Sequence, residues 1–296
     1  SFLRRLANDL PSGKFYYDFK RDKDNLGKYF KQCKELKPPY DNKPRVRVLC
    51  MQVLKYLKTK YDTLNNEDGS YDVCVLLNYA AFTRLHEIFG SDDITNITLA
   101  WASLIYVWNS FVDDNFNKPL YKKCKPIDNI FTNDWHIRKI LYDYFVDYDT
   151  IKKNFIFYND ICQKYYMYLE IIIDIYKYFN KFCVTDNKDK CPDFYNKCKE
   201  YDPSNYIHEV ICFKEIEEKK SASVKLKLAE KEKPQSIELH SGEEFGSLLS
   251  TKETDFSDNS TLQVLSSDRV KTFGNVLLGL VVTSMTSGVL YKVKIH

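Results

Sequence analysis

The sequence predicts an all-α protein with a helical, cysteine-containing head, a disordered charged stalk and a single C-terminal transmembrane helix. All nine cysteines lie between Cys33 and Cys212, a charged, serine-containing stretch follows them, and the membrane-length apolar run Gly274–Tyr291 lies beyond that stretch. Gly and Pro number only nine each, which leaves few breakers and suits long helices better than a turn-rich β-sandwich. The expected boundaries are 1–213 for the head, 214–271 for the stalk, 272–292 for the transmembrane helix and 293–296 for a short tail.

Composition limits the classes of function. Hydrophobic residues make up 44% and aromatic residues 15% of the chain, so a sizeable core can form and disorder of the whole chain is excluded. The net charge is only +3, with basic and acidic residues interspersed along the head, so we expect no nucleic-acid partner. Charges from Arg4 to Lys14 interrupt the N-terminal region, so we expect no signal peptide, and export by another route or through the anchor.

Five stretches of the head carry apolar residues at steps of three and four, the spacing of one helix face. In order, they are Arg45–Tyr61, Asp72–Phe89, Ile97–Val112, a helix from Trp135 to Tyr148 capped by Asn133 or Asp134, and Phe157–Phe182. Pro44 suits the first turn of the first helix, and Gly90 is a C-cap for the second. Breaks at proline predict two short helices, near Pro192–Glu200 and Ser204–Cys212.

The helix over Phe157–Phe182 is rich in tyrosine. Most of these tyrosines follow the apolar stripe and are expected in the core. Tyr166 and Tyr178 lie off the stripe, so we expect them to be exposed. An exposed tyrosine patch would indicate a binding surface, because tyrosine offers a large contact area with little loss of rotamer freedom.

Composition changes after Cys212. The stalk is rich in Lys, Glu, Ser and Thr and contains no Cys, Tyr or Trp, which leaves too little apolar surface to offset chain entropy. Parts such as Glu215–Lys233 are expected to be transiently helical. The run Gly274–Tyr291 contains no charge and is close to the lower length limit of a spanning helix. Its alternative is a buried or amphipathic terminal helix, and basic residues on both sides leave its orientation open.

The odd number of cysteines leaves at least one thiol if the others pair. Structural zinc sites use short Cys-x2-4-Cys steps, and the closest cysteines here, Cys191 and Cys198, are further apart than that. Disulfides in an oxidising compartment therefore fit better than zinc, and buried thiols are the third alternative. We predict Cys50 or Cys162, each on a predicted helix stripe, as the buried thiol.

No motif completes a catalytic, cofactor or metal site. The histidines lack metal-ligand spacing. Asp113 and Asp114 can hold magnesium only if substrate phosphates complete the shell, and capping or solvation near a helix end is the preferred interpretation. Asn96 and Asn259 begin glycosylation triplets. We expect no catalytic residue, no cofactor and no small-molecule substrate.

Four stretches together resemble one family. They are LPSGKFYYDF (Leu10–Phe19), YDVCVLLNY (Tyr71–Tyr79), WHIRKILYDY (Trp135–Tyr144) and CPDFYNKC (Cys191–Cys198). In this order, with a stalk and an apolar run behind them, they are similar to the Plasmodium interspersed repeat (PIR) superfamily, and most closely to the Vir proteins of vivax-type malaria parasites. The bias toward Lys, Asn, Tyr, Phe and Ile, residues with A/T-rich codons, agrees with this resemblance.

The resemblance implies a variant antigen that is exported to the membrane or surface of the infected red cell. It implies roles in antigenic variation, immune evasion and adhesion, with the membrane, a host cell-surface receptor or antibodies as partners, and no enzymatic activity. It also implies a longer cytoplasmic tail than Val293–His296, so we expect the tail to be truncated. The cysteines that match as disulfide candidates are Cys33, Cys74, Cys183, Cys191, Cys198 and Cys212, to which we add Cys124.

A second hypothesis keeps the protein inside the cell. It is an intracellular, membrane-tethered scaffold or trafficking protein in parasite or host-cell organelles. Its cysteines would be reduced, which distinguishes it from an antigen displayed in an oxidising space.

Overall fold

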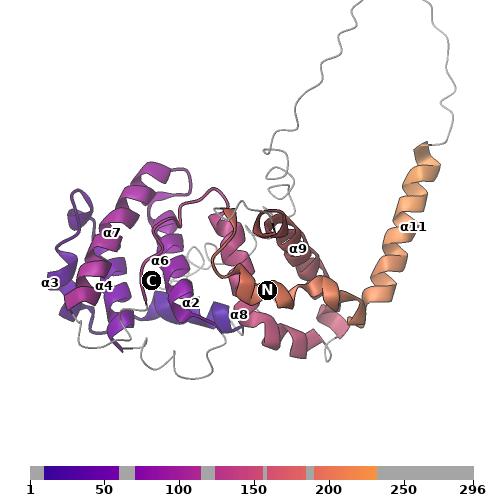
Figure 1. The fold of residues 1–296 in the computed structure, drawn as a ribbon, viewed down its shortest axis with the longest axis horizontal. Coiled ribbons are helices and arrows are strands. Elements are labelled where there is room, and N and C mark those ends of the chain that lie inside the picture. The colour runs from indigo at the N-terminus through magenta and orange to yellow at the C-terminus, as the bar shows by residue number, and fades with distance from the viewer. Residues whose placement is uncertain (1–9, 60–70, 115–123, 156–158, 185–189, 232–296) are drawn as a thin grey trace, which may run out of the picture. The chain divides into compact units, whose positions relative to one another are not determined.

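A computed structural model describes residues 10–59, 71–114, 124–155, 159–184 and 190–231 (Figure 1). Every regular element in these residues is helical, so the predicted all-α class is confirmed for them. They divide into two compact units, where the sequence predicts one head. Of the described residues, the first unit comprises those within 10–152 and Cys191–Tyr201, and the second comprises those within 153–190 and 202–231.

The first unit packs α4 (Pro44–Thr59), α6 (Val73–Phe89) and α7 (Ile94–Asp114) against one another (Figure 1). Its core contains large, fully buried side chains, among them Trp101 and Trp108. They lie on the apolar faces whose spacing predicts these helices, because such a face must be buried against another element. The remaining helices of this unit are α2 (Pro11–Arg21), η1 (Leu26–Tyr29), α3 (Phe30–Cys33), η2 (Tyr40–Asn42), α8 (Trp135–Phe155), α10 (Tyr195–Cys198) and η5 (Lys199–Tyr201).

Helix ends follow local sequence signals. The Asp72 side chain accepts a hydrogen bond from the Cys74 N–H (2.8 Å) and caps the N-terminus of α6. Gly90 follows this helix with a φ of 88°, a conformation that glycine adopts without strain. α4 begins at Pro44, as predicted. α2 is a helix that the periodicity does not predict, since its apolar stripe is short.

The second unit is built on α9 (Asn159–Cys183). The short turn η6 (Pro203–Asn205) packs against α9, and η7 (Ile207–Glu209) packs against the long α11 (Phe213–Lys231). The two short helices predicted around residues 192–212 are therefore found as single turns of α- and 3-10 helix, two in each unit.

The prediction that Tyr166 and Tyr178 are exposed was wrong, because they are 3% and 6% exposed. Tyr166 is covered by α11, where its hydroxyl donates to Glu217 (2.7 Å). The Tyr178 ring packs edge-on against Phe182 (5.2 Å between centroids). A helix that packs on more than one side buries residues off its main stripe, so these tyrosines do not form the exposed patch that would indicate a binding surface.

α11 also changes the predicted stalk, since residues 214–231 form a regular helix where a stalk with only transient helix over Glu215–Lys233 was expected. The rest of the predicted stalk, the predicted transmembrane helix Gly274–Tyr291, the tail and Asn259 lie outside the described residues. Among the helices that the structure does describe, none combines the length and hydropathy that crossing a bilayer requires.

Disulfides join segments that are distant in sequence, two of them in the first unit and one in the second. The pairs are Cys33–Cys50, Cys74–Cys124 and Cys162–Cys212, and Cys183 and Cys191 are disulfide-bonded as well.

The predicted thiols were wrong. Cys50 and Cys162 are both bonded, whereas Cys198, which was expected in a disulfide, is a buried thiol whose S–H donates to the Tyr195 carbonyl (3.4 Å). A cysteine on the buried face of a helix lies where a second segment packs. Cys33 of α3 reaches Cys50 of α4 in this way, with 5.9 Å between their Cα atoms, a normal disulfide separation.

This arrangement predicts a simple thiol count. In denaturant without reductant, one cysteine of the full chain should react with iodoacetamide, and peptide mapping should identify it as Cys198. In the folded protein the same thiol should react far more slowly, because it is buried. Reduction before labelling is the control and should modify all nine cysteines. Modification of all nine without reductant would contradict the assignment.

Candidate functional site

An extended segment, residues 124–127, crosses the first unit without regular secondary structure. Cys124 is fully buried, so the polar backbone groups around it need partners within the protein. Side chains of α7 supply two of them. The indole N–H groups of Trp108 and Trp101 donate to the carbonyls of Cys124 (3.0 Å) and Ile127 (3.2 Å).

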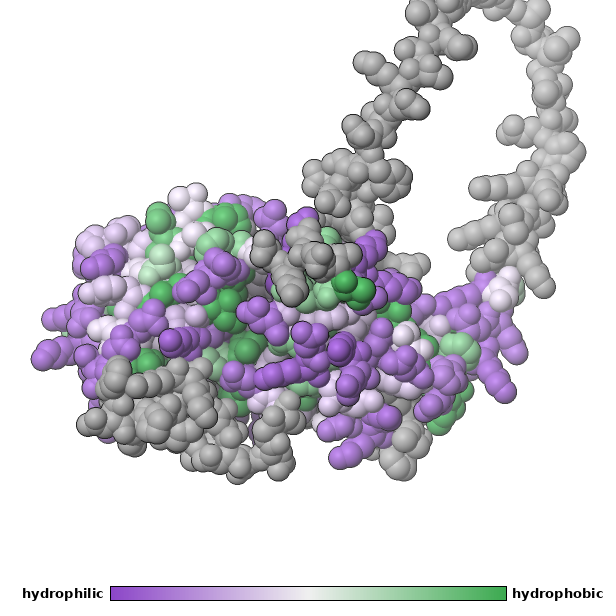
Figure 2. Space-filling view, viewed as in Figure 1, coloured by the Kyte–Doolittle hydropathy of each residue, from purple (hydrophilic) through white to green (hydrophobic). Residues whose placement is uncertain are grey.

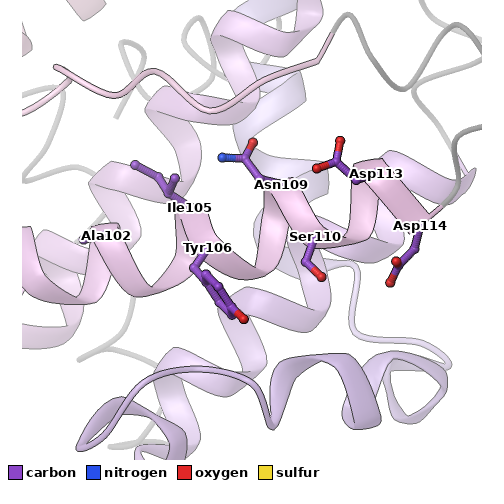
Figure 3. A pocket seen from close by; sticks show the side chains of 7 residues that line it. All are labelled: Ala102, Ile105, Tyr106, Asn109, Ser110, Asp113 and Asp114. Atoms are coloured by element: carbon purple, nitrogen blue, oxygen red, sulfur yellow. The ribbon is translucent and has the colours of Figure 1, made fainter.

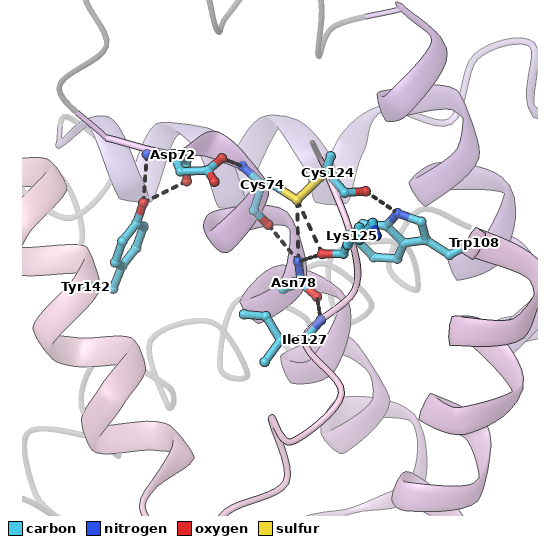
Figure 4. Close-up of a disulfide and its surroundings, with 8 residues drawn as sticks. All are labelled: Asp72, Cys74, Asn78, Trp108, Cys124, Lys125, Ile127 and Tyr142. Carbon is cyan, nitrogen blue, oxygen red and sulfur yellow. Dashed lines mark hydrogen bonds between the residues drawn. A yellow bond between two sulfur atoms is a disulfide. The ribbon is translucent and has the colours of Figure 1, made fainter. Parts of the chain in front are cut away.

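Asn78 of α6 provides the other partners of this segment (Figure 4). Its amide nitrogen donates to the carbonyls of Lys125 (3.1 Å) and Cys74 (2.9 Å), and its amide oxygen accepts from the Ile127 N–H (2.7 Å). The residue is only 1% exposed. A buried amide that both donates and accepts along an extended backbone replaces a neighbouring strand, so the segment keeps its hydrogen bonds inside a helical unit.

The Cys74–Cys124 disulfide fixes the start of the segment beside Asn78 (Figure 4). Two residues before Cys74, the Tyr142 hydroxyl of α8 accepts from the Asp72 N–H (2.8 Å) and donates to the Asp72 carbonyl (2.7 Å). The first turn of α6 is thereby attached both to the extended segment and to α8.

Buried carboxylates attach α2 to α8. Asp147 is 2% exposed and accepts hydrogen bonds from the N–H (2.8 Å) and the hydroxyl (2.6 Å) of Ser12. Tyr16 donates to Asp143 (2.5 Å), whose other oxygen accepts from Lys139 (2.5 Å). Burial raises the pKa of Asp147 to about 7 despite the opposing effect of the Ser12 hydrogen bonds, and it also raises the pKa of Asp143. Because both carboxylates already bind groups of α2, the cluster is a structural attachment.

His86 is enclosed by aromatic rings, with centroids 4.6 Å from Trp135 and 5.0 Å from Phe82. Within the described part of the chain, neither ring nitrogen has a hydrogen-bond partner. Burial, followed by the nearby His136, lowers the pKa of His86 to about 4. The residue is therefore a neutral core side chain at neutral pH. In the residues that the structure describes, no three His, Cys, Asp or Glu side chains come together to hold a metal ion.

The outer face of α7 carries an open depression of about 530 Å³ (Figure 3). Because every lining residue that the structure describes belongs to this one helix, these side chains approach a bound molecule from one side only, whereas catalytic groups converge from several elements. Figure 3 shows Asp113 and Asp114 pointing to opposite sides of the helix, so they do not form a paired magnesium site. The lining residues are Ala102, Ile105, Tyr106, Asn109, Ser110, Asp113 and Asp114.

Asn96, the described glycosylation candidate, lies in the first turn of α7. Its amide nitrogen donates to Asp93 (2.8 Å), and its amide oxygen accepts from the Tyr40 hydroxyl (3.0 Å). The folded structure thus uses both ends of this side chain to fasten the helix start.

Comparison with known proteins decides the family. A family model described as Plasmodium vivax Vir protein matches residues 10–295, nearly the whole chain. The chain belongs to the Vir family. A search of the curated proteins and of the solved structures gives no match. The resemblance seen in the four sequence stretches is therefore confirmed, and the geometry above describes the head of a Vir protein.

Sequence analysis missed several residues that hold this Vir head together. Asn78 lies in the stretch YDVCVLLNY, four residues after Cys74, where a polar side chain interrupts an apolar helix face. That interruption was the available signal. The hydrogen bonds between Ser12 and Asp147 have no comparable signal in the sequence, because these two residues are 135 positions apart in the chain.

The Asn78→Ala substitution should destabilise the first unit by about 2 kcal/mol, because the Lys125 carbonyl and the Ile127 N–H lose their partner at a partly buried site. Each loss there costs roughly 1 kcal/mol, the lower end of the range for buried groups. Urea unfolding followed by circular dichroism measures this change. Asn109→Ala on the exposed face of α7 is the matched control and should change stability by less than about 0.5 kcal/mol. Equal effects of the two substitutions would contradict the role assigned to Asn78.

The lowered pKa of His86 predicts that this residue destabilises the fold in acid. Between pH 6.5 and about 4, the unfolded chain binds more protons at His86 than the folded protein does. The contribution of His86 to the free energy of unfolding is therefore intact above pH 6.5. It falls with the pH below that value, by up to about 3 kcal/mol. The His86→Phe variant should be free of this loss, so its unfolding free energy should rise relative to the unsubstituted protein on acidification.

The effect of Asp147 has the opposite sign, because a raised pKa means that the folded protein binds more protons between pH 4 and 7. The pH dependence of the unfolding free energy of the unsubstituted protein alone therefore does not isolate His86. The test is the difference in unfolding free energy between His86→Phe and the unsubstituted protein at each pH. His208→Phe, at an exposed position, is the control and should follow the unsubstituted protein. Parallel curves for His86→Phe and the unsubstituted protein would refute the prediction.

Proposed function

We propose that this Vir chain is a variable surface antigen that is exported to the infected red cell and displays its disulfide-bonded head to the outside. It takes part in antigenic variation and immune evasion, and it adheres to host receptors. The observation that carries the proposal is the set of disulfides in both units. Disulfides persist in oxidising spaces and are rare in the reducing cytosol, so these bonds favour a head that faces the extracellular side.

The apolar run Gly274–Tyr291 is the membrane anchor in this proposal. It has no charge over its length and follows the head at a distance of more than forty residues. A single spanning helix in this position leaves the whole head on one side of the bilayer.

The proposed role is binding rather than catalysis. The depression on α7 presents groups from a single helix, and its two carboxylates diverge. Neither arrangement places a nucleophile, an acid or a base around a reacting atom. The buried carboxylates of Asp143 and Asp147 are held by α2 and serve the fold.

Staining of infected red cells tests the surface location. An antibody raised against the described residues of the first unit should label intact, unpermeabilised cells, and mild external protease should remove the signal. An antibody to a protein of the host-cell cytosol is the control and should label only permeabilised cells. Labelling of the head only after permeabilisation would contradict the proposal and favour the intracellular scaffold.

A further inference from the structure

Positive charge is concentrated in one segment of the first unit. Residues 28–47 contain seven Lys or Arg and two Glu or Asp, a net charge of +5, whereas the whole chain carries +3. The remainder of the chain is therefore slightly acidic. A segregated charge of this kind creates a local field that attracts polyanions.

The fold gathers part of this segment on one surface. The Cys33–Cys50 disulfide holds α3 against α4. The Lys37 N–H donates to the Ser103 hydroxyl (2.7 Å) and holds the following loop against α7. We define the basic face as Phe30, Lys31, Lys34, Lys37, Arg47 and Tyr106. Figure 2 shows hydrophilic residues at the end of the first unit where α3 lies.

Two exposed aromatic rings lie among these cations. The Lys34 ammonium is 5.1 Å and the Arg47 guanidinium 5.2 Å from the centroid of Phe30. The Lys37 ammonium is 4.1 Å from the centroid of Tyr106. Phe30 and Tyr106 are 39% and 49% exposed. These cation–π contacts hold the charges beside flat rings without neutralising them.

The lysines of the basic face differ from other basic residues of the unit in their ion pairing with described residues. Among the described residues, Lys31, Lys34 and Lys37 make no ion pair, and all three are exposed. Other basic residues of this unit differ in this respect. Lys20 pairs with Glu87 (3.3 Å), and Lys55 pairs with Asp22. The basic face thus keeps its charge available for a ligand.

We propose that the basic face binds a sulfated glycosaminoglycan chain. Its lysines meet the sulfate and carboxylate groups that repeat along such a chain, and Phe30 and Tyr106 pack against the faces of the sugar rings. The inference deepens the proposed function and rests on it for the location of the head. In an oxidising space outside cells, the abundant polyanion is sulfated polysaccharide, whereas anionic lipids concentrate in the cytoplasmic leaflet.

Binding of the full, disulfide-bonded chain in detergent to immobilised heparan sulfate tests the proposal. The triple variant Lys31→Gln, Lys34→Gln, Lys37→Gln should bind roughly tenfold more weakly, since each exposed charge pair contributes modestly. The matched control replaces three exposed lysines elsewhere in the same unit, Lys14→Gln, Lys125→Gln and Lys197→Gln, and removes the same charge. It should bind within about twofold of the unsubstituted chain. Tyr106→Ala should weaken binding further in the triple variant.

Two further probes separate sulfated glycan from other polyanions. Chemically desulfated heparan sulfate should bind weakly, and vesicles of phosphatidylserine should bind no better than vesicles of phosphatidylcholine. Binding to heparan sulfate should also fall steeply as NaCl rises from about 0.1 M to 1 M, because the screening length shrinks from about 10 Å to 3 Å.

Three results would overturn the proposal. They are equal weakening by the two triple variants, undiminished binding of the desulfated chain, and binding to phosphatidylserine vesicles in place of heparan sulfate. This experiment is independent of cell staining. A protein that binds heparan sulfate through the basic face but stains only permeabilised cells would retain the site and lose the proposed location.

Discussion

The first unit depends on the need to pair a partly buried extended backbone, residues 124–127, inside a helical protein. In the part of the chain that the structure describes, no strand lies beside residues 124–127. A buried carbonyl or N–H without a partner costs roughly 1–3 kcal/mol. Asn78, Trp101 and Trp108 supply the partners, and the Cys74–Cys124 disulfide fixes the entry. The two tryptophans serve at once as the largest core side chains and as donors, so packing and hydrogen bonding on α7 are satisfied by the same residues.

The sequence predicts the long helices because apolar periodicity is a local signal. α6 ends at Gly90 and begins after Asp72, as capping chemistry requires. The attachment of α2 to α8 through Ser12 and Asp147 is not local. No short-range pattern specifies which distant carboxylate a helix start will meet, so neither the buried carboxylates nor the division into two units could be predicted in this way.

Cysteine pairing also depends on contacts between distant segments, which local sequence patterns do not predict. An odd count correctly requires a thiol, but parity does not say which cysteine carries it. Cys50 and Cys162 were assigned as thiols because they lie on buried helix faces. In the structure, α3 packs over Cys50, and the turns that precede α11 bring Cys212 to Cys162. Cys198, on a single helical turn, is buried and not in a disulfide. Pairing depends on tertiary contacts between segments, which burial alone does not identify.

In this Vir head the polar groups that hold the fold are buried, and the exposed charges can be substituted without loss of the fold. Buried groups such as Asn78 and Asp147 are fixed by partners on other elements, and their replacement leaves unpaired groups in the core. Exposed charges such as Lys31 and Lys34 make few contacts that fold the protein, and surface substitutions usually change stability by less than about 0.5 kcal/mol. A frame held by disulfides and buried hydrogen bonds therefore allows the outer surface to change while the fold is kept. The same freedom means that a binding face made of exposed lysines and rings can be gained or lost without rebuilding the core.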